Sequence, residues 1–190
     1  MIIPQAILEP IDGVTIRQAS EADAHHILKA HRASIRGEGS KYYDADIVKD
    51  WHSGLTEDGY IRAMRRGEIY FIAIRDDDGL CLGFSGSVPE KGDAQTEEAL
   101  NSGAQYENDE GIFHVATYVH PEGIGKGIGA ALLKCSELSA RERGATKFAI
   151  DSSVNAKPFY EKFGFRNLGS HNHEMSSGKM MKSYRMEKDF

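Results

Sequence analysis

The stretch VHPEGIGKGIGAALL, residues 119–133, joins a strongly apolar strand pattern to an amphipathic helix through alternating glycines between positions 123 and 129. Glycine has no Cβ, so several backbone N–H groups are left unshielded at the start of the helix. Such N–H groups and the helix dipole attract anions, and Lys126 can add a positive charge at the rim. The stretch therefore predicts a phosphate-binding turn, with a merely flexible connection as the plain alternative.

Two common phosphate-binding motifs compete for this turn. A P-loop is excluded because no glycine is followed by Lys and then Ser or Thr at the required spacing. A dinucleotide-binding fold stays open, because Gly125, Gly127 and Ala130 satisfy G-x-G-x-x-A and Asp151 follows the next strand. The insertion at 120–122 and the short remainder after Asp151, about 40 residues, make it the weaker alternative.

The rest of the chain predicts one mixed α/β unit. Alternating or apolar runs predict strands at 14–18, 69–74, 80–88, 112–119, 147–150 and 180–186. The Asp78-Gly79 ending of residues 76–79 predicts a hairpin between the second and third of these strands. Helical spacing and capping residues predict helices at about 20–34, around 47–51, at 57–66 and 127–143, and after Asn155, which is expected to be the N-cap of a helix with Pro158 in its first turn. Residues 89–111 carry no pattern and are expected to be mobile or a functional lid.

Composition narrows the class of protein. The chain has 190 residues, 40% of them hydrophobic and 27% charged, which fits a single globular domain. A net charge of −6 disfavours nucleic-acid binding, and no apolar run is long enough to span a membrane. Cys81 and Cys135 predict neither a disulfide nor a zinc site, and the cytoplasm is the expected compartment.

Two segments in order resemble a known family. Residues 119–133 resemble motif A of the GNAT superfamily of N-acetyltransferases, and NAKPFYEKFGF at 155–165 is similar to that family's N-A-x-x-F-Y-E-x-x-G-F segment. The resemblance covers residues 14–190 more loosely. It implies an α/β (α+β) fold in one domain, residues 1–190 with a leader at 1–13. The expected sheet is mixed, has about six to seven strands, and contains a splayed parallel pair at the cofactor site.

The resemblance implies transfer of the acetyl group from acetyl-CoA to a primary amine of a small molecule or peptide, by direct attack in a ternary complex and without a metal. The family usually has Arg or Gln where Ile124 stands, so weaker coenzyme binding is expected here. The implied coenzyme-binding residues are Tyr118, Val119, Ile124, Gly125, Lys126, Gly127, Ile128, Gly129, Ala130 and Asn155. The resemblance also implies that a backbone N–H near Tyr118 or Val119 polarises the thioester carbonyl and stabilises the oxyanion.

Two side chains are candidates for the proton transfers. Tyr160 falls where the family often has a tyrosine that protonates the leaving thiolate, although a buried core tyrosine is the alternative. His114 could accept the proton of the amine, because an ordinary imidazole titrates near neutral pH. A satisfied core histidine is the alternative for His114, and Glu110 or an ordered water could be the base instead.

The acceptor pocket of the family is built largely from its first helices, which makes Tyr42, Tyr43 and Trp51 candidate walls or cation-binding rings, with core packing as the alternative. The remaining histidines show no third ligand at a recognisable metal-site spacing. A rival class is a non-catalytic acyl-CoA-binding or sensor domain. The sequence does not determine the oligomeric state, and a homodimer is one alternative.

Overall fold

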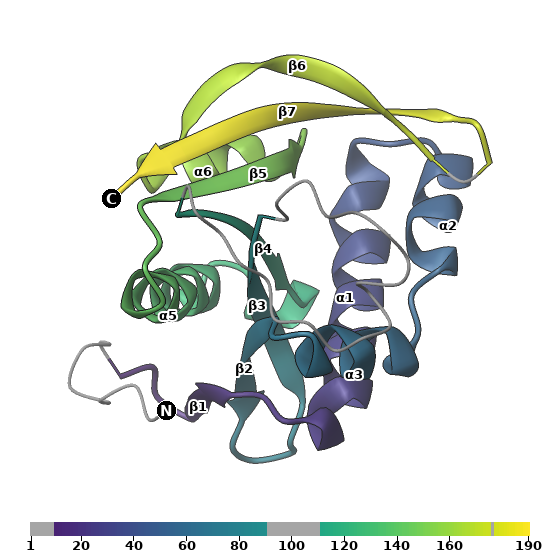
Figure 1. Cartoon of the computed structure of the whole chain (residues 1–190). Coiled ribbons are helices and arrows are strands. Elements are labelled where there is room, and N and C mark those ends of the chain that lie inside the picture. The colour runs from purple at the N-terminus through teal and green to yellow at the C-terminus, as the bar shows by residue number, and fades with distance from the viewer. Residues whose placement is uncertain (1–9, 91–110, 176) are drawn as a thin grey trace.

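A computed structural model of the chain describes residues 10–90, 111–175 and 177–190. A twisted seven-stranded sheet runs through it, with helices on both faces (Figure 1). The strands are β1 (Val14–Gln18), β2 (Ile69–Arg75), β3 (Cys81–Pro89), β4 (Ile112–Val119), β5 (Lys147–Ser153), β6 (Arg166–Glu174) and β7 (Met180–Asp189). The α-helices are α1 (Ala24–Gly37), α2 (Ala45–Ser53), α3 (Glu57–Arg65), α5 (Ile128–Glu142) and α6 (Lys157–Lys162). Short 3-10 helices are η2 (Glu21–Asp23), η3 (Gly39–Lys41) and η4 (Pro121–Gly123).

The strand order is β1-β2-β3-β4-β5-β7-β6. β4 and β5 run parallel and are joined through α5, whereas every other neighbouring pair in this sheet is antiparallel. The predicted mixed sheet, its single crossover and its strand number are thereby confirmed. A doubly wound dinucleotide-binding sheet, which is built from parallel strands, is excluded.

The predicted hairpin joins β2 and β3. Gly79 adopts a φ of 72°, and the Asp78 carboxylate accepts a hydrogen bond from the Leu80 N–H at 3.0 Å. The Arg75 guanidinium donates to the same carboxylate through Nε at 2.9 Å. The turn residues therefore satisfy the groups that the hairpin exposes, as an Asp-Gly turn is expected to do.

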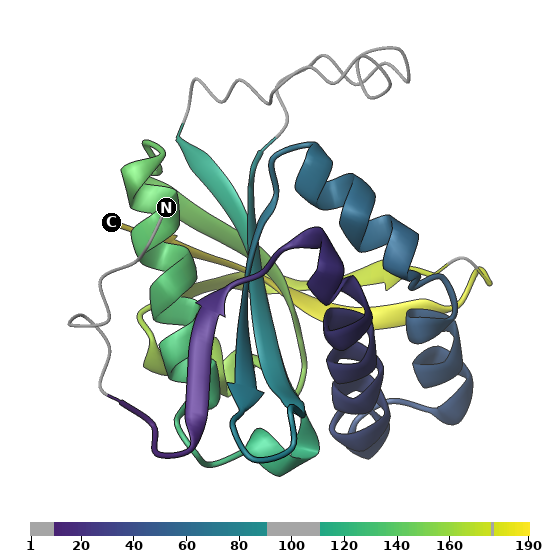
Figure 2. The same ribbon diagram turned by 90° about the horizontal axis from the view of Figure 1, so that it is seen from below.

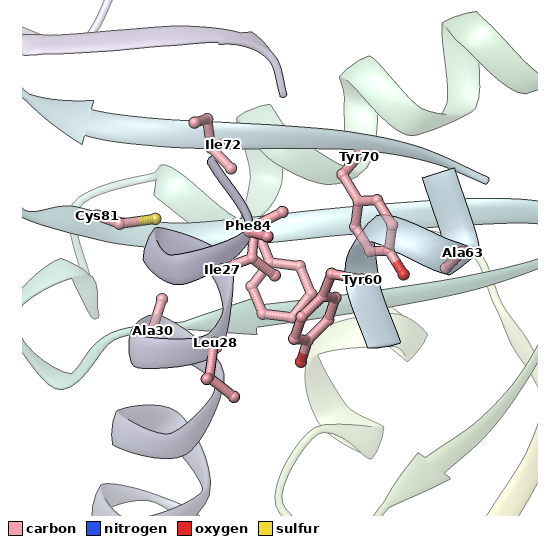
Figure 3. Packing of buried hydrophobic residues seen from close by; sticks show 10 residues of the cluster. Ile27, Leu28, Ala30, Tyr60, Ala63, Tyr70, Ile72, Cys81 and Phe84 are labelled. Atoms are coloured by element: carbon pink, nitrogen blue, oxygen red, sulfur yellow. The ribbon is translucent and has the colours of Figure 1, made fainter. Parts of the chain in front are cut away.

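Two layers of side chains cover the sheet. Figure 2 shows α5 on one side of the sheet and α1 and α3 on the other. The core beneath α1 and α3 gathers aliphatic and aromatic residues from both helices and from β2 and β3, among them Ile27, Tyr60, Tyr70, Ile72 and Phe84 (Figure 3). Because both faces are covered, the central strands are apolar on both sides.

Two strands in the C-terminal half differ from the sequence prediction. β6 was not predicted, because it is an edge strand whose side chains are almost all exposed and it carries no apolar alternation. β5 continues three residues beyond Ile150, through the polar residues Asp151, Ser152 and Ser153. The expected mobile segment at 89–111 lies almost wholly outside the described residues.

His31 is a buried polar residue on α1. Its Nδ1 lies 2.6 Å from the Tyr60 hydroxyl, and its ring packs 3.7 Å, centroid to centroid, from the ring of Tyr118. Burial lowers the pKa of His31 to about 3, so the ring is neutral in the folded protein.

We expect this histidine to make the fold acid-sensitive. The pKa of His31 is about 6.5 when the chain is unfolded. Between that pH and about 3, the unfolded state therefore binds a proton at His31 and the folded state does not. The free energy of unfolding should therefore fall as pH drops from about 6.5 towards 3, by about 2 kcal/mol between neutral pH and pH 5. Urea unfolding at several pH values measures this slope. His31→Gln should flatten it and His25→Gln should not; equal slopes in wild type and His31→Gln would contradict the assignment.

Candidate active site

β4 and β5 separate at the centre of the molecule. They pair only from Ile112 to His114 and from Lys147 to Ala149, after which the two strands diverge. A cavity of about 360 Å³ opens at this point. Its walls come from α1, α2, β4, β5, α6 and the β6–β7 hairpin, and include Ser34, Ile35, Trp51, His114, Thr117, Tyr118, Asp151, Asn155, Tyr160, His173 and Ser183.

The backbone of β4 presents polar groups to this gap. The Thr117 N–H donates to the Tyr160 hydroxyl at 3.1 Å, which shows that it points away from β3. Backbone directions alternate along a strand, so the N–H of Val119 faces the same way, whereas that of Tyr118 faces β3. Of the two N–H groups predicted to polarise the thioester, only the Val119 group is directed at the gap.

Tyr160 reaches the gap from α6. Its side chain is only 2% exposed and packs edge-on against the rings of Phe159 and Phe165. Burial raises the pKa of the Tyr160 phenol well above its ordinary value. Tyr160 is therefore a buried core residue whose hydroxyl lies at the cavity, and its role as a proton donor stays a prediction.

The glycine turn lies between β4 and α5. Gly125 and Gly127 adopt φ values of 77° and 79°, which strain any residue with a side chain. Gly127 is the N-cap, and the first helical hydrogen bond runs from the Ala131 N–H to its carbonyl at 3.1 Å. The N–H groups of Ile128, Gly129 and Ala130 therefore precede the helical ladder and are available to an anion.

Close packing holds the turn in place. A Cβ at Gly37, the last residue of α1, would lie 2.5 Å from Cγ of Pro121 in η4. A Cβ at Gly129 would lie 3.2 Å from both Phe159 and Val119. Because Gly37 has no Cβ, the end of α1 can pack against η4 beside the glycine turn. Because Gly129 has no Cβ, the N-terminal end of α5 can pack against β4 and α6.

Ile124 is the apolar exception in the turn. Its side chain is 46% exposed, and it lies between η4 and the start of α5. A guanidinium at this position would face solvent and could reach an anion held by the turn.

We therefore predict that Ile124→Arg tightens the binding of acetyl-CoA by roughly 3- to 10-fold, because a charged hydrogen bond contributes about 1 kcal/mol or more. Isothermal titration calorimetry measures the change. Ile124→Gln, which adds hydrogen-bonding capacity without charge, should give a smaller gain. Weaker binding by the Arg variant would mean that the turn does not hold the phosphates.

Asn155 was predicted to be the N-cap of the following helix, and this is wrong. The N-cap of α6 is Ala156, and no side chain caps that helix; Pro158 does stand in its first turn. Asn155 instead lines the cavity. Its Oδ1 is buried and has no hydrogen-bond partner in the described part of the chain, so the amide is left to serve a molecule bound there.

His114 lies on the opposite side of the gap from α5. Its side chain is 48% exposed, lines the cavity, and places Nε2 at 3.4 Å from Oε1 of Glu90. The alternative of a buried core histidine is therefore wrong, because the side chain of His114 is about half exposed at the cavity. Glu110, the other candidate base, lies outside the described residues.

The three aromatic candidates for the acceptor pocket occupy different places. Trp51 lines the cavity and packs edge-on against Tyr118. The side chain of Tyr118 was not predicted to line the site; only its backbone was. The Tyr43 hydroxyl donates to the Lys182 carbonyl and accepts from the Val154 N–H, both at 2.7 Å, so it ties the end of η3 to the sheet. Tyr42 is 56% exposed and lies outside the cavity wall.

Among the residues that the structure describes, His, Cys, Asp and Glu form no group of three that could hold a metal ion. Burial raises the pKa of the Cys135 thiol to about 11, which disfavours it as a nucleophile. In the described helices, no segment has the length and apolar character needed to cross a bilayer.

Comparisons with known proteins agree with this geometry. The model of a family described as "Acetyltransferase (GNAT) domain" matches residues 95–188. No curated protein matches the chain by sequence.

Solved structures share the fold over almost the whole chain. A GCN5-related N-acetyltransferase from Rhodopseudomonas palustris is 22% identical with a TM-score of 0.72, over 96% of this chain and 99% of that one. A ribosomal-protein-alanine N-acetyltransferase from Brucella melitensis is 20% identical with a TM-score of 0.65, over 93% and 99%. A phosphinothricin acetyltransferase from Sinorhizobium meliloti, in complex with acetyl-CoA, is 18% identical with a TM-score of 0.65, over 94% and 89%.

The family match identifies residues 95–188 as a GNAT acetyltransferase domain, and this part of the chain contains the diverging strands β4 and β5 and the glycine turn before α5. The chain as a whole has the fold of solved N-acetyltransferases.

Proposed function

We propose that this protein transfers the acetyl group of acetyl-CoA to a primary amine, by direct attack of the amine in a ternary complex. The observation that carries the proposal is the position of Tyr160. Its hydroxyl lies in the gap between β4 and β5, and the cavity that it lines extends to His114 and Trp51 on the other face of the sheet.

The coenzyme side of the site fits a phosphate-bearing substrate with an amide-containing arm. The N–H groups at the start of α5, with Lys126 beside them, would hold the phosphates, and Gly125 and Gly127 allow close approach. The Asn155 amide, whose Oδ1 is buried without a partner in the described chain, would hydrogen-bond the pantetheine arm. When bound, acetyl-CoA supplies an activated acetyl thioester at the gap.

The reacting groups belong to β4 and α6. No strand of the described sheet pairs with the Val119 N–H, so this group can polarise the thioester carbonyl and stabilise the oxyanion. Tyr160 would protonate the departing thiolate, and its raised pKa keeps the phenol protonated until then. His114, with Glu90 beside it, would accept the proton of the attacking amine.

The acceptor side favours a small molecule or the end of a peptide. Trp51 and Tyr118 provide aromatic walls, and Asp151 is the acidic residue of the cavity lining. Aromatic faces and a carboxylate both attract a cationic amine before it loses its proton. The relatives include one whose name specifies a ribosomal protein and one whose name specifies phosphinothricin, so both kinds of acceptor belong in a test.

Thermal-shift measurements with acetyl-CoA, CoA and NAD, followed by thiol release over a panel of amines and peptides, test the proposal. We expect both coenzyme A compounds to stabilise the protein, NAD to have no effect, and at least one amine to release thiol. Stabilisation without thiol release for any acceptor would instead support a non-catalytic acyl-CoA-binding domain. A single-domain organisation and a cytoplasmic location stay predictions of the sequence.

A further inference from the structure

A chain of hydroxyl groups crosses the core beneath the candidate active site. Ser136 Oγ on α5 donates to Ser85 Oγ on β3 at 2.8 Å, and Ser85 Oγ lies 2.9 Å from Thr117 Oγ1 on β4. The Thr117 backbone N–H in turn donates to the Tyr160 hydroxyl at 3.1 Å. Ser85 and Ser136 are fully buried, so their hydroxyl groups depend on partners inside the protein.

The direction of these hydrogen bonds follows from the first of them. Ser85 accepts from Ser136, so its own proton is left to be donated to the Thr117 oxygen. The hydroxyl chain thereby holds the Thr117 side chain in place on β4, and the N–H of the same residue contacts Tyr160. Each donation polarises the next hydroxyl, which strengthens the chain as a whole.

Tyr160 receives a hydrogen bond at its oxygen from the Thr117 N–H, at 3.1 Å. A phenol oxygen that accepts this hydrogen bond must direct its own proton elsewhere, and the cavity is the side that remains open. The same donor also stabilises the phenolate that remains when this proton leaves.

We propose that Ser136, Ser85 and Thr117 are positioning residues that direct the Tyr160 proton at the leaving sulfur of acetyl-CoA. The inference rests on the proposed function. In the step concerned, the C–S bond breaks after the C–N bond has formed, the sulfur takes its electron pair and the Tyr160 proton, and the proton released by the amine passes to His114. The phenolate regains a proton from water in the cavity.

The chain offers a matched control for Ser85. Ser87 lies two residues further along β3 on the same face and is also fully buried. Its Oγ has no hydrogen-bond partner among the described residues. Removing this hydroxyl changes the core in the same way as removing that of Ser85, but leaves the hydroxyl chain intact.

The test measures steady-state kinetics of Ser85→Ala, Ser136→Ala, Thr117→Val and the control Ser87→Ala, each also in a Tyr160→Phe background. We expect the first three to lower kcat about 3- to 10-fold with little change in KM for acetyl-CoA, as loss of one hydrogen bond predicts, and Ser87→Ala to have no effect. In the Tyr160→Phe background the same substitutions should have no further effect, because the group on which they act is gone. Thermal unfolding identifies any variant that is misfolded. The kcat values of the correctly folded variants then test the positioning role.

A second measurement separates proton donation from packing. With an acetyl thioester of an acidic aromatic thiol, which leaves without protonation, the kcat values of wild type and Ser85→Ala should converge. The inference would be overturned by an equal loss with both thioesters, or by an equal loss in the wild-type and Tyr160→Phe backgrounds. Those results leave the proposed function standing, since it fails only if the wild-type protein acetylates no acceptor.

Discussion

Tyr160→Phe is expected to lower kcat for acetyl transfer about 100-fold or more, because it removes the proton donor while keeping the ring. The ring is 2% exposed and packs between Phe159 and Phe165, so the phenylalanine should fill the same space. The affinity for acetyl-CoA should change little, since the proposed phosphate site lies at the start of α5. Steady-state kinetics and calorimetry on the same preparation measure both quantities.

The matched control for this prediction is Tyr184→Phe. Tyr184 is a partly buried tyrosine of the same core cluster, and it lies on β7. Its substitution removes a phenolic hydroxyl nearby and should leave kcat unchanged. If Tyr160→Phe also retained the wild-type rate, Tyr160 would be a packing residue and water in the cavity would have to protonate the thiolate.

His114→Ala is expected to lower kcat/KM roughly 10- to 100-fold at neutral pH, because the amine then loses its local proton acceptor. The fold should be unaffected, since the side chain is 48% exposed and contacts Glu90 at the cavity rim. The pH–rate profile should differ between the variant and the wild type, because the proposed proton acceptor of the amine is gone. Initial rates across pH, at saturating acetyl-CoA, provide this measurement.

Two variants complete the test of the base. Glu90→Gln should give a smaller decrease than His114→Ala, because it removes only the partner of the imidazole. His25→Gln, in α1, should have no effect on the profile. A pH–rate profile that survives His114→Ala unchanged would remove this histidine from the mechanism.

Local patterns were sufficient to predict most of the fold. β4 was predicted with both of its boundaries, and the hairpin at Asp78 and Gly79 was predicted from its turn residues. In these cases apolar periodicity and turn chemistry act within a few residues. β6 was missed because a solvent-exposed edge strand is held by its pairing with β7, which leaves little hydrophobic signal in the sequence.

The site shows the same division between local and long-range information. The turn around Gly127 and the tyrosine at position 160 could be predicted because short motifs carry them. The hydroxyl chain could not, because Ser85 and Ser136 are 51 residues apart and nothing local marks either serine as buried and paired. Strand alternation could have placed Thr117 at the gap, since it follows Val115 on the same face of β4.

The role of Asn155 illustrates a further limit. A cap and a cavity-lining amide demand the same residue type just before a helix, so the sequence pattern does not distinguish them. Only the backbone of α6, which begins one residue later than expected, separates the two roles.

The most direct test of the central claim is to follow an isotopically labelled acetyl group from acetyl-CoA by mass spectrometry, in the presence of an acceptor that supports thiol release. We predict that the label appears on the amine nitrogen of the acceptor, in equal amount to the free thiol formed, and that the protein itself carries none. Label that stays on the coenzyme for every acceptor, although acetyl-CoA binds, would contradict an acetyltransferase and identify a protein that only binds the coenzyme.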